Sequence, residues 1–390
     1  MLTFDNKIVS IIKKNFKLSK KIFLHEPGFK KKDFINVSKS LKSTHVSSSG
    51  KFTYIFEKKL EELTKSKFVI STINGTSALH SILKIIGTDY KDEILVPALT
   101  FVGTANAIRY CGANPNFIDV EDKTFGVDPI KLENYLAKNC IFKKNLCVNK
   151  KTRKTIRALI CVHVFGNPCR IIEIKKILKK YKIILIEDAA EGIGSYFMKK
   201  HLGTFGEFGI LSFNGNKTIT TGGGGAILLK NKKYFNKLIK FVSTGKEKHP
   251  YEYFYKSLGY NYRLPSLNAS LGISQLKSLS LILKDKKNVY QYYKNIFKNL
   301  DGLKLHNPIK FSKSNYWLNT IILDENKKKF KNLVIKKLIK NNFYCRPLWY
   351  PLHKLSYFKN SPKDNLECTE NLYKRCINIP SSANLLDSIK

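Results

Sequence analysis

The chain has 390 residues, of which 43% are hydrophobic and 25% charged, a composition typical of soluble globular proteins. No apolar run approaches the roughly 20 residues of a membrane span, and the N-terminus lacks the continuous apolar segment of a signal peptide. We therefore expect a cytoplasmic protein without a membrane span, and the length predicts two or three domains.

The formal net charge of +41 raises the possibility of a nucleic-acid partner, because clustered cations bind phosphates. Only seven of the basic residues are arginine, however, and arginine is the residue favoured for reading phosphates and bases. The lysines are spread along the whole chain. The pattern favours a compositional bias of the surface, and we expect no nucleic-acid partner.

In chain order, residues 1–40 predict a helix followed by an irregular arm that contains HEPGF (25–29), and residues 53–65 have helical periodicity. Strands and helices then alternate, which predicts an α/β fold with a mostly parallel sheet and helices on both faces. In such sheets, ligands bind beyond the carboxyl ends of the strands. The predicted strands are 67–72, 93–98, 115–120, 157–164, 183–188, 208–213 and 225–230, and the helices between them are 74–86, 100–111 and 171–181.

A basic insertion at 141–156 interrupts this pattern and predicts a surface loop or hairpin. From 266 onward the pattern is helical, with a Lys-rich helix to about 300, and residues 316–351 suggest a smaller α/β domain. We expect three parts: an N-terminal helix and arm (1–40), a large domain (41–265) and a small C-terminal domain (266–390).

The eight cysteines contain no C-x-x-C pair and are irregularly spaced, so they are interpreted as buried or incidental thiols. Glu187 and Asp188 are adjacent on a predicted strand, and alternation places their side chains on opposite faces. The sequence therefore predicts no metal site.

Lys217 lies in SFNGNKTITTGGGGAI (212–227), in a polar turn that follows an apolar strand and precedes four glycines. Lysine amines form Schiff bases with carbonyl compounds, and pyridoxal phosphate (PLP) is the common one. A lysine in a flexible glycine loop is the alternative interpretation of this segment alone.

Three further segments follow predicted strands. NGTSAL (74–79) is a strand–helix junction whose free N–H groups suit an anion, although Thr76 or Ser77 as a simple helix cap explains it equally. Asp188 ends a buried strand, where it either pairs with a cation, such as a protonated pyridine nitrogen, or caps the next helix. Phe101 either stacks on a flat ring or packs in the core.

Together, NGTSAL, VPALTFVGTANAI (96–108), IEDAAE (186–191) and SFNGNK followed by TTGGGG resemble, in this order, the DegT-type aminotransferases, PLP enzymes of fold type I that act on nucleotide sugars. The resemblance runs from HEPGF to about residue 382. Within the family, SFNGNK and HEPGF look most like the branch that aminates C4 of UDP-linked 2-acetamido-4-keto-6-deoxy sugars, in the bacillosamine and legionaminic acid pathways.

The resemblance implies a role for each of these residues. Lys217 would hold PLP and then act as the general base. Asp188 would pair with the pyridine nitrogen and Phe101 would stack on the ring. Glu191 matches the position that flanks the ring near its 3-hydroxyl or the substrate. The phosphate would be held by the turn that contains Gly75, Thr76 and Ser77, joined by Ser212.

The resemblance also implies a homodimer with shared active sites. Asn261 in GYNYRLP (259–265) would reach the cofactor phosphate of the other protomer, and Arg263 would fix this loop on the substrate side. Trp349 and His353 in RPLWYPLH (346–353) are candidates for sugar contact. His353 also has an ordinary structural interpretation.

The implied reaction moves an amino group from L-glutamate to a nucleotide-linked 4-keto-6-deoxy sugar for surface-glycan biosynthesis. Two alternatives remain open: amination at C3 of a related sugar, and a basic binding or regulatory protein that keeps the fold without turnover. Lys217 argues against the family variant that has histidine there and dehydrates its substrate.

Overall fold

The computed structural model describes residues 3–247 and 249–390. Its centre is a nine-stranded sheet in the order β1-β11-β10-β7-β6-β2-β3, with the β4–β5 hairpin joined to β6. β10, β7, β6, β2 and β3 run parallel, and β11 is antiparallel to both neighbours. The strands are β1 (Phe68–Thr72), β2 (Asp92–Pro97), β3 (Asn114–Ile118), β4 (Cys140–Lys143), β5 (Leu146–Asn149), β6 (Thr155–Val162), β7 (Ile184–Asp188), β10 (Phe208–Ser212) and β11 (Gly225–Leu229). The predicted α/β fold class is confirmed.

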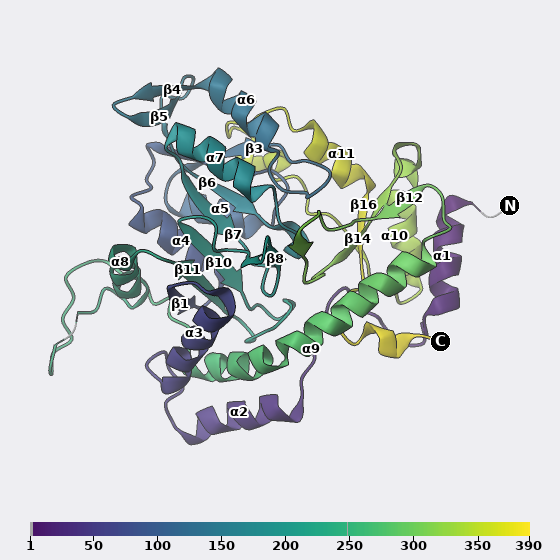
Figure 1. Cartoon of the computed structure of the whole chain (residues 1–390), viewed down its shortest axis with the longest axis horizontal. Helices are drawn as coiled ribbons and strands as arrows, with labels where there is room; N and C mark the ends of the chain where they lie inside the picture. The colour runs from purple at the N-terminus through teal and green to yellow at the C-terminus, as the bar shows by residue number, and fades with distance from the viewer. Residues whose placement is uncertain (1–2, 248) are drawn as a thin grey trace.

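Helices cover both faces of this sheet (Figure 1). Because side chains alternate along a strand, Leu185 packs into the core on one face and Ile186 into the core on the other. The first face carries α3 (Lys51–Thr64), α6 (Pro129–Asn139) and α7 (Ile171–Tyr181), and the second carries α4 (Gly75–Ile85), α5 (Val102–Tyr110) and α8 (Lys232–Val242). The predicted strands and helices of this region all form, and the insertion at 141–156 contains the β4–β5 hairpin.

The predicted N-terminal helix and the irregular arm containing HEPGF form, but the arm ends at residue 30 and not at residue 40. α1 (Phe4–Asn15) is followed by a second helix, α2 (Lys31–Lys42), whose first turn is closed by the Lys30 N–H donating to Asp33 Oδ2 at 2.7 Å. This helix buries no large apolar side chain, and Phe34 stays 68% exposed. Its apolar residues Phe34, Val37 and Leu41 nevertheless recur at helical spacing, a signal that was available in the sequence.

A single uninterrupted helix, α9 (Ser266–Ile296), occupies the region where the sequence suggested a helical stretch followed by a second helix. Figure 1 shows α9 crossing from α3 to the C-terminal region beside α1 and α10. Its first half packs in the same core as α3, through Ile273, and its second half packs with α1, through Tyr293. The division at residue 266 stays a prediction.

The C-terminal region has its own four-stranded antiparallel sheet, in the order β12-β14-β16-β15. A small three-stranded sheet, β13-β8-β9, connects it to the large region. The elements are β8 (Tyr196–Phe197), β9 (Lys200–His201), β12 (Leu303–Leu305), β13 (Ser312–Lys313), β14 (Asn319–Leu323), α10 (Lys331–Lys340), β15 (Arg346–Pro347), α11 (Glu367–Arg375) and β16 (Cys376–Ile379). Over residues 3–247 and 249–390, every helix falls short of the length and apolarity that membrane crossing requires.

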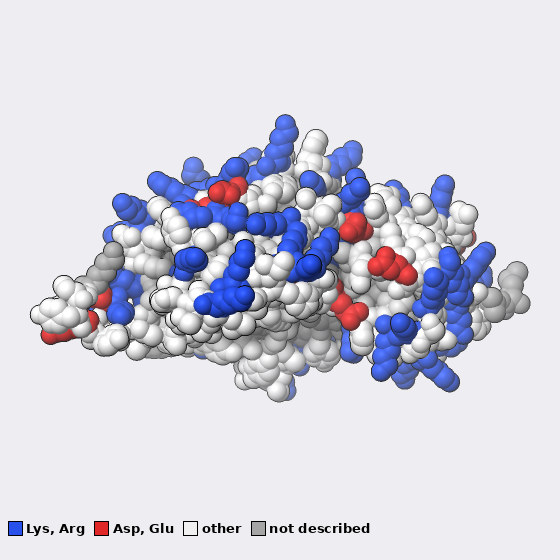
Figure 2. All heavy atoms as spheres, turned by 90° about the horizontal axis from the view of Figure 1, so that it is seen from below, with Lys and Arg blue, Asp and Glu red and all other residues white. Residues whose placement is uncertain are grey.

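Figure 2 shows Lys and Arg side chains over the whole length of one face, with far fewer Asp and Glu side chains between them. The absence of a nucleic-acid partner stays a prediction.

Candidate active site

A cavity of about 320 Å³ opens where β1, β2, β7 and β10 end, within the range of about 300–1,000 Å³ usual for small-molecule sites. Eight of the residues singled out in the sequence line it: Gly75, Thr76, Phe101, Asp188, Glu191, Ser212, Lys217 and Trp349. They converge because the carboxyl ends of parallel strands share one edge of the sheet. A larger cavity of about 830 Å³ lies beside α6, and none of the predicted site residues lines it.

Lys217 projects its amine between a carboxylate and an aromatic face. Its Nζ lies 3.0 Å from Glu191 Oε1 and 4.0 Å from the centroid of a Trp317 ring. The Trp317 ring is fixed in turn, because its Nε1 donates to the Asn216 carbonyl at 2.8 Å. The amine is therefore held in one direction inside a mostly buried site.

Glu191 is held by contacts to two loops. The Phe165 N–H donates to Glu191 Oε2 at 2.8 Å, and the Asn315 side chain donates to the Glu191 carbonyl at 2.7 Å. Phe165 adopts a positive φ of 56°, uncommon for a bulky residue, which aims its N–H at the carboxylate. Burial raises the pKa of Glu191, although Lys217 opposes this.

Asp188 is the buried carboxylate at the floor of the cavity. Thr104 Oγ1 donates to Oδ2 at 2.7 Å, and the Ala190 N–H donates to Oδ1 at 3.1 Å. Burial raises the pKa of Asp188 despite these hydrogen bonds. Within the described residues, no Lys, Arg or His forms an ion pair with this carboxylate, so its charge suits a cationic group that enters the cavity, such as a protonated pyridine nitrogen.

The start of α4 provides the anion-binding part of the cavity. Asn74 Oδ1 accepts the Ser77 N–H at 2.7 Å, while the N–H groups of Gly75 and Thr76 come first in the helix, where no carbonyl of an earlier turn is available. A Cβ added at Gly103 would lie 2.6 Å from Thr76 Oγ1, so glycine is needed there to leave room for this hydroxyl. These donors suit a phosphate group.

Phe101 is an exposed aromatic in the cavity wall, with 56% of its surface accessible. It directly precedes α5, so its alternative role in core packing does not hold in this chain. The cavity thus combines the Asp188 carboxylate, the Lys217 amine, the Phe101 ring and the phosphate-type turn at the start of α4. These residues fit PLP.

Four predicted site residues do not line this cavity. Ser77 has its N–H bonded to Asn74, and Asn261 is exposed outside the cavity. Arg263 pairs with Glu57 Oε1 at 2.6 Å, which anchors the 259–265 loop to α3. His353 is buried and 3.1 Å from Glu370 Oε1, as its structural interpretation anticipated.

Sequence reasoning missed several residues that line the cavity, among them Thr104, Asn216 and Trp317. Thr104 lies three residues after Phe101, a spacing that puts both at the start of one helix and was an available signal. Trp317 comes from the C-terminal region and faces Lys217 across 100 residues of chain, so no local pattern predicts it.

Comparison with known proteins gives a consistent result. Residues 28–388 match the DegT/DnrJ/EryC1/StrS aminotransferase family. GDP-perosamine synthase from Escherichia coli O157:H7 is 32% identical over 369 residues, covering 94% of each chain. A UDP-4-amino-4,6-dideoxy-N-acetyl-beta-L-altrosamine transaminase from Campylobacter jejuni is 30% identical over 350 residues, covering 89% of each.

Solved structures have the same fold. PseC from Helicobacter pylori, an aminotransferase involved in the biosynthesis of pseudoaminic acid, has a TM-score of 0.85 at 25% identity, over 95% of this chain and 98% of its own. A Streptococcus pneumoniae protein solved in a PLP form has a TM-score of 0.83 at 22% identity, over 93% of each chain. The chain therefore belongs to the DegT/DnrJ/EryC1/StrS aminotransferase family and is a PLP-dependent enzyme of the transaminase class.

Proposed function

We propose that this enzyme transfers an amino group from L-glutamate to the C4 keto group of a nucleotide-linked 4-keto-6-deoxy sugar in the cytoplasm. The observation that carries the proposal is the convergence of Lys217, Asp188, Phe101 and the start of α4 on one cavity. The 4-amino-4,6-dideoxy sugar in the name of the Campylobacter jejuni relative supports amination at C4.

When bound, PLP supplies an electron sink for the negative charge that develops next to the transferred nitrogen. Asp188 keeps a proton on the pyridine nitrogen, since its buried carboxylate is stabilised by a cation at that position. Gly75 and Thr76 bind the phosphate through backbone N–H groups, and Phe101 supports the ring plane.

Lys217 Nζ takes a proton from one carbon of the reacting system and returns it to another. A positioned base of this kind contributes about 10²–10⁴-fold in rate. Glu191, 3.0 Å from Nζ, orients the amine, and the Trp317 ring keeps water from its other side. Trp349 packs against Phe165, with ring centroids 4.9 Å apart, and presents an aromatic surface for the sugar.

A homodimer with shared sites is part of the proposal. The 249–258 loop exposes Tyr251 (83%) and Leu258 (78%), and α2 exposes Phe34, an amount of apolar surface that a partner would cover. Asn261 lies three residues beyond this loop, and its side chain is exposed. Mixing inactive Lys217→Ala and Asn261→Ala proteins tests the sharing: a mixed dimer keeps one intact site and regains activity, whereas no recovery would place Asn261 outside the partner's site.

The substrate assay uses purified holoenzyme, L-glutamate and a panel of UDP- and GDP-linked 4-keto-6-deoxy sugars, including the UDP-linked 2-acetamido sugar that the sequence motifs favour. We expect 2-oxoglutarate to form only with a keto sugar present, and NMR of the product to place nitrogen on C4. Nitrogen on C3 would contradict the proposal and support the alternative, amination at C3 of a related sugar. A holoenzyme whose visible absorption does not respond to glutamate would contradict L-glutamate as the amino donor.

A further inference from the structure

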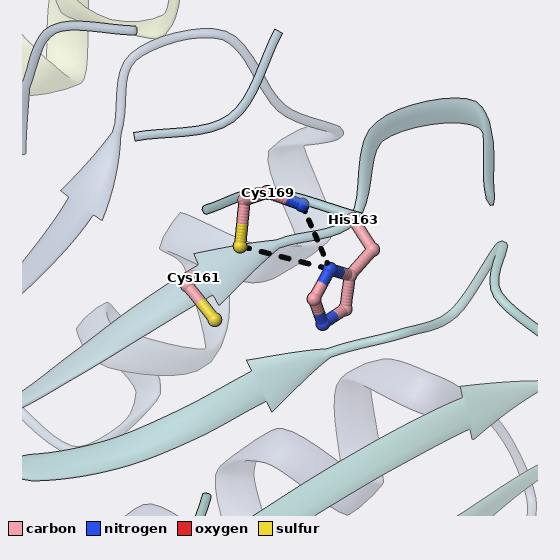
Figure 3. A group of neighbouring side chains, drawn as sticks. All are labelled: Cys161, His163 and Cys169. Carbon is pink, nitrogen blue, oxygen red and sulfur yellow. Dashed lines mark hydrogen bonds between the residues drawn. The ribbon is translucent and has the colours of Figure 1, made fainter. Parts of the chain in front are cut away.

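Cys161, His163 and Cys169 form a fully buried group on the side of the sheet opposite Asp188. Cys161 lies near the end of β6, His163 directly follows the strand, and Cys169 precedes α7. Figure 3 shows the three side chains pointing toward one another. Cys161 pairs with Glu187 in the strand register and Val162 pairs with Asp188, so alternation separates this group from the PLP cavity.

The spacing of the donor atoms matches metal coordination. One ligand atom from each residue lies within 4.8 Å of the others. Cys169 Sγ is 3.6 Å from His163 Nδ1. Bonds of about 2.3 Å to sulfur and 2.1 Å to nitrogen, at a tetrahedral angle, would put these two atoms about 3.6 Å apart.

Glu187 contacts the imidazole of His163 at Nε2, the ring nitrogen that does not face Cys169. His163 Nε2 lies 2.9 Å from Glu187 Oε2, and this carboxylate also accepts the N–H groups of Gly203, Phe205 and Gly206 at 2.5 to 2.8 Å. Metal-binding histidines usually donate their second ring nitrogen to a carboxylate, which directs the free nitrogen at the metal. The present partner of Nδ1 is the Cys169 N–H at 3.3 Å, a long contact that a metal could replace.

The charges in the group are compatible with a cation. Two thiolates would match the charge of a divalent ion, and the Glu187 carboxylate beside His163 keeps its own three backbone N–H donors. The cysteines of the group are free thiols.

We propose that Cys161, His163 and Cys169 bind a thiophilic metal ion, Zn²⁺ or Cu⁺, which fixes the end of β6 to the turn before α7. Each sulfur binds as a thiolate, so the two protons that the group holds on its ligand atoms leave to solvent, and no electron is transferred. Among the residues described, the group supplies three donor atoms, whereas structural Zn²⁺ usually has four. Zn²⁺ and Cu⁺ are therefore tested separately. The proposal departs from the sequence-based expectation of no metal site.

The site would act on the PLP cavity indirectly. The His163 N–H donates to the Asp188 carbonyl at 3.0 Å, so a metal on the imidazole would hold the backbone beneath the cavity floor. His163 and the two cysteines are therefore positioning residues, and their test is metal content.

The experiment uses the holoenzyme, reduced with a phosphine and incubated separately with Zn²⁺, Cu⁺ or Mg²⁺ before desalting. We expect one Zn²⁺ or Cu⁺ per chain by elemental mass spectrometry and no retained Mg²⁺. Cys161→Ser and Cys169→Ser should lose the ion, whereas Cys376→Ser, which changes a fully buried thiol outside the group, should keep it.

Should the serine variants fail to fold, wild-type protein still tests the proposal. Bound metal should protect the peptides containing Cys161 and Cys169 from alkylation in mild denaturant, while Cys376 reacts equally with and without metal. No retained thiophilic ion, equal retention in all three variants, or a Cys161–Cys169 disulfide in place of metal would overturn the proposal.

Discussion

Glu187 and Asp188 are neighbours on β7, both fully buried, yet they lie in opposite electrostatic environments. Burial acts to raise both pKa values. At Glu187, His163 and the backbone N–H groups of the 203–206 turn outweigh burial, and the pKa is lowered. At Asp188, Thr104 and one backbone N–H are too few, and the pKa is raised.

The difference distinguishes a carboxylate that stabilises the fold, Glu187, from one that takes part in the chemistry of the site, Asp188. Glu187 has its charge fully satisfied inside the protein and connects β6, β7 and the turn at 203–206. Asp188 has hydrogen bonds but, among the residues that the structure describes, no ion-pair partner, and it faces the cavity. A buried charge that the protein leaves uncompensated is stabilised only when a positive group binds, which is how a PLP site gains specificity for a protonated pyridine ring.

The largest expected effect is on stability at Glu187. Glu187→Gln removes the charge that pairs with buried His163, and breaking such a pair costs about 3–5 kcal/mol. Urea unfolding should show this loss, and Glu207→Gln, an exposed change in the same segment, should be neutral. A loss below about 1 kcal/mol would mean that Glu187 carries little of the fold's stability.

Asp188→Asn should have the opposite profile. We expect kcat to fall by about 10²–10³-fold, the range for a lost electrostatic contact in an active site. The free energy of unfolding of the PLP-free protein should be kept or raised slightly, because ionised Asp188 destabilises the fold at neutral pH. Steady-state kinetics and urea unfolding of the same preparation measure both quantities. An Asp188→Asn enzyme that stays active, or one that does not fold, would contradict the different roles assigned to Asp188 and Glu187.

Thr104→Val tests how far the Asp188 environment depends on one hydroxyl. The substitution keeps the shape and removes the 2.7 Å hydrogen bond to Oδ2. A hydrogen bond to a charged group contributes about 1.5–3 kcal/mol, so kcat should fall about 10- to 100-fold. Thr88→Val, at a buried hydroxyl that does not line the cavity, is the matched control and should retain most activity.

Much of this site follows from local sequence, and the rest depends on contacts across the chain. Lys217, Asp188, Glu191 and Phe101 follow predicted strands, and the topology of parallel sheets brings such residues together. Trp317 reaches the amine from the C-terminal region, and no periodicity or turn signal places it there.

The cysteines show the same limit. Their irregular spacing hides the fact that Cys161 and Cys169 meet at His163, because the strand end and the turn before α7 fold back on each other. α2 was missed for another reason: its apolar residues Phe34, Val37 and Leu41 recur at helical spacing, but the Lys-rich segment was interpreted as an irregular arm.

The smallest effect is the pH dependence of stability in the PLP-free protein. Glu187 has a folded pKa below its ordinary 4.5, so its stabilisation is present above that pH and is lost as the pH falls through the folded pKa. Asp188 has a folded pKa above 3.8, so its ionisation destabilises the fold at neutral pH, and acidification relieves this.

Unfolding at a series of pH values therefore separates the two carboxylates. The deficit of Glu187→Gln should shrink below about pH 4.5, whereas any gain of Asp188→Asn at pH 7 should disappear on acidification. Parallel pH profiles for the two variants would contradict the assigned pKa directions.

The most direct test of the central claim is to locate the lysine that holds the cofactor. Holoenzyme is reduced with borohydride, digested and analysed by peptide mass spectrometry, with the exposed Lys199→Ala variant as control. We predict a pyridoxyl group on Lys217 in both proteins and none in Lys217→Ala. A pyridoxyl group on another lysine of the folded wild-type enzyme, or none at all, would contradict the assignment of the active site.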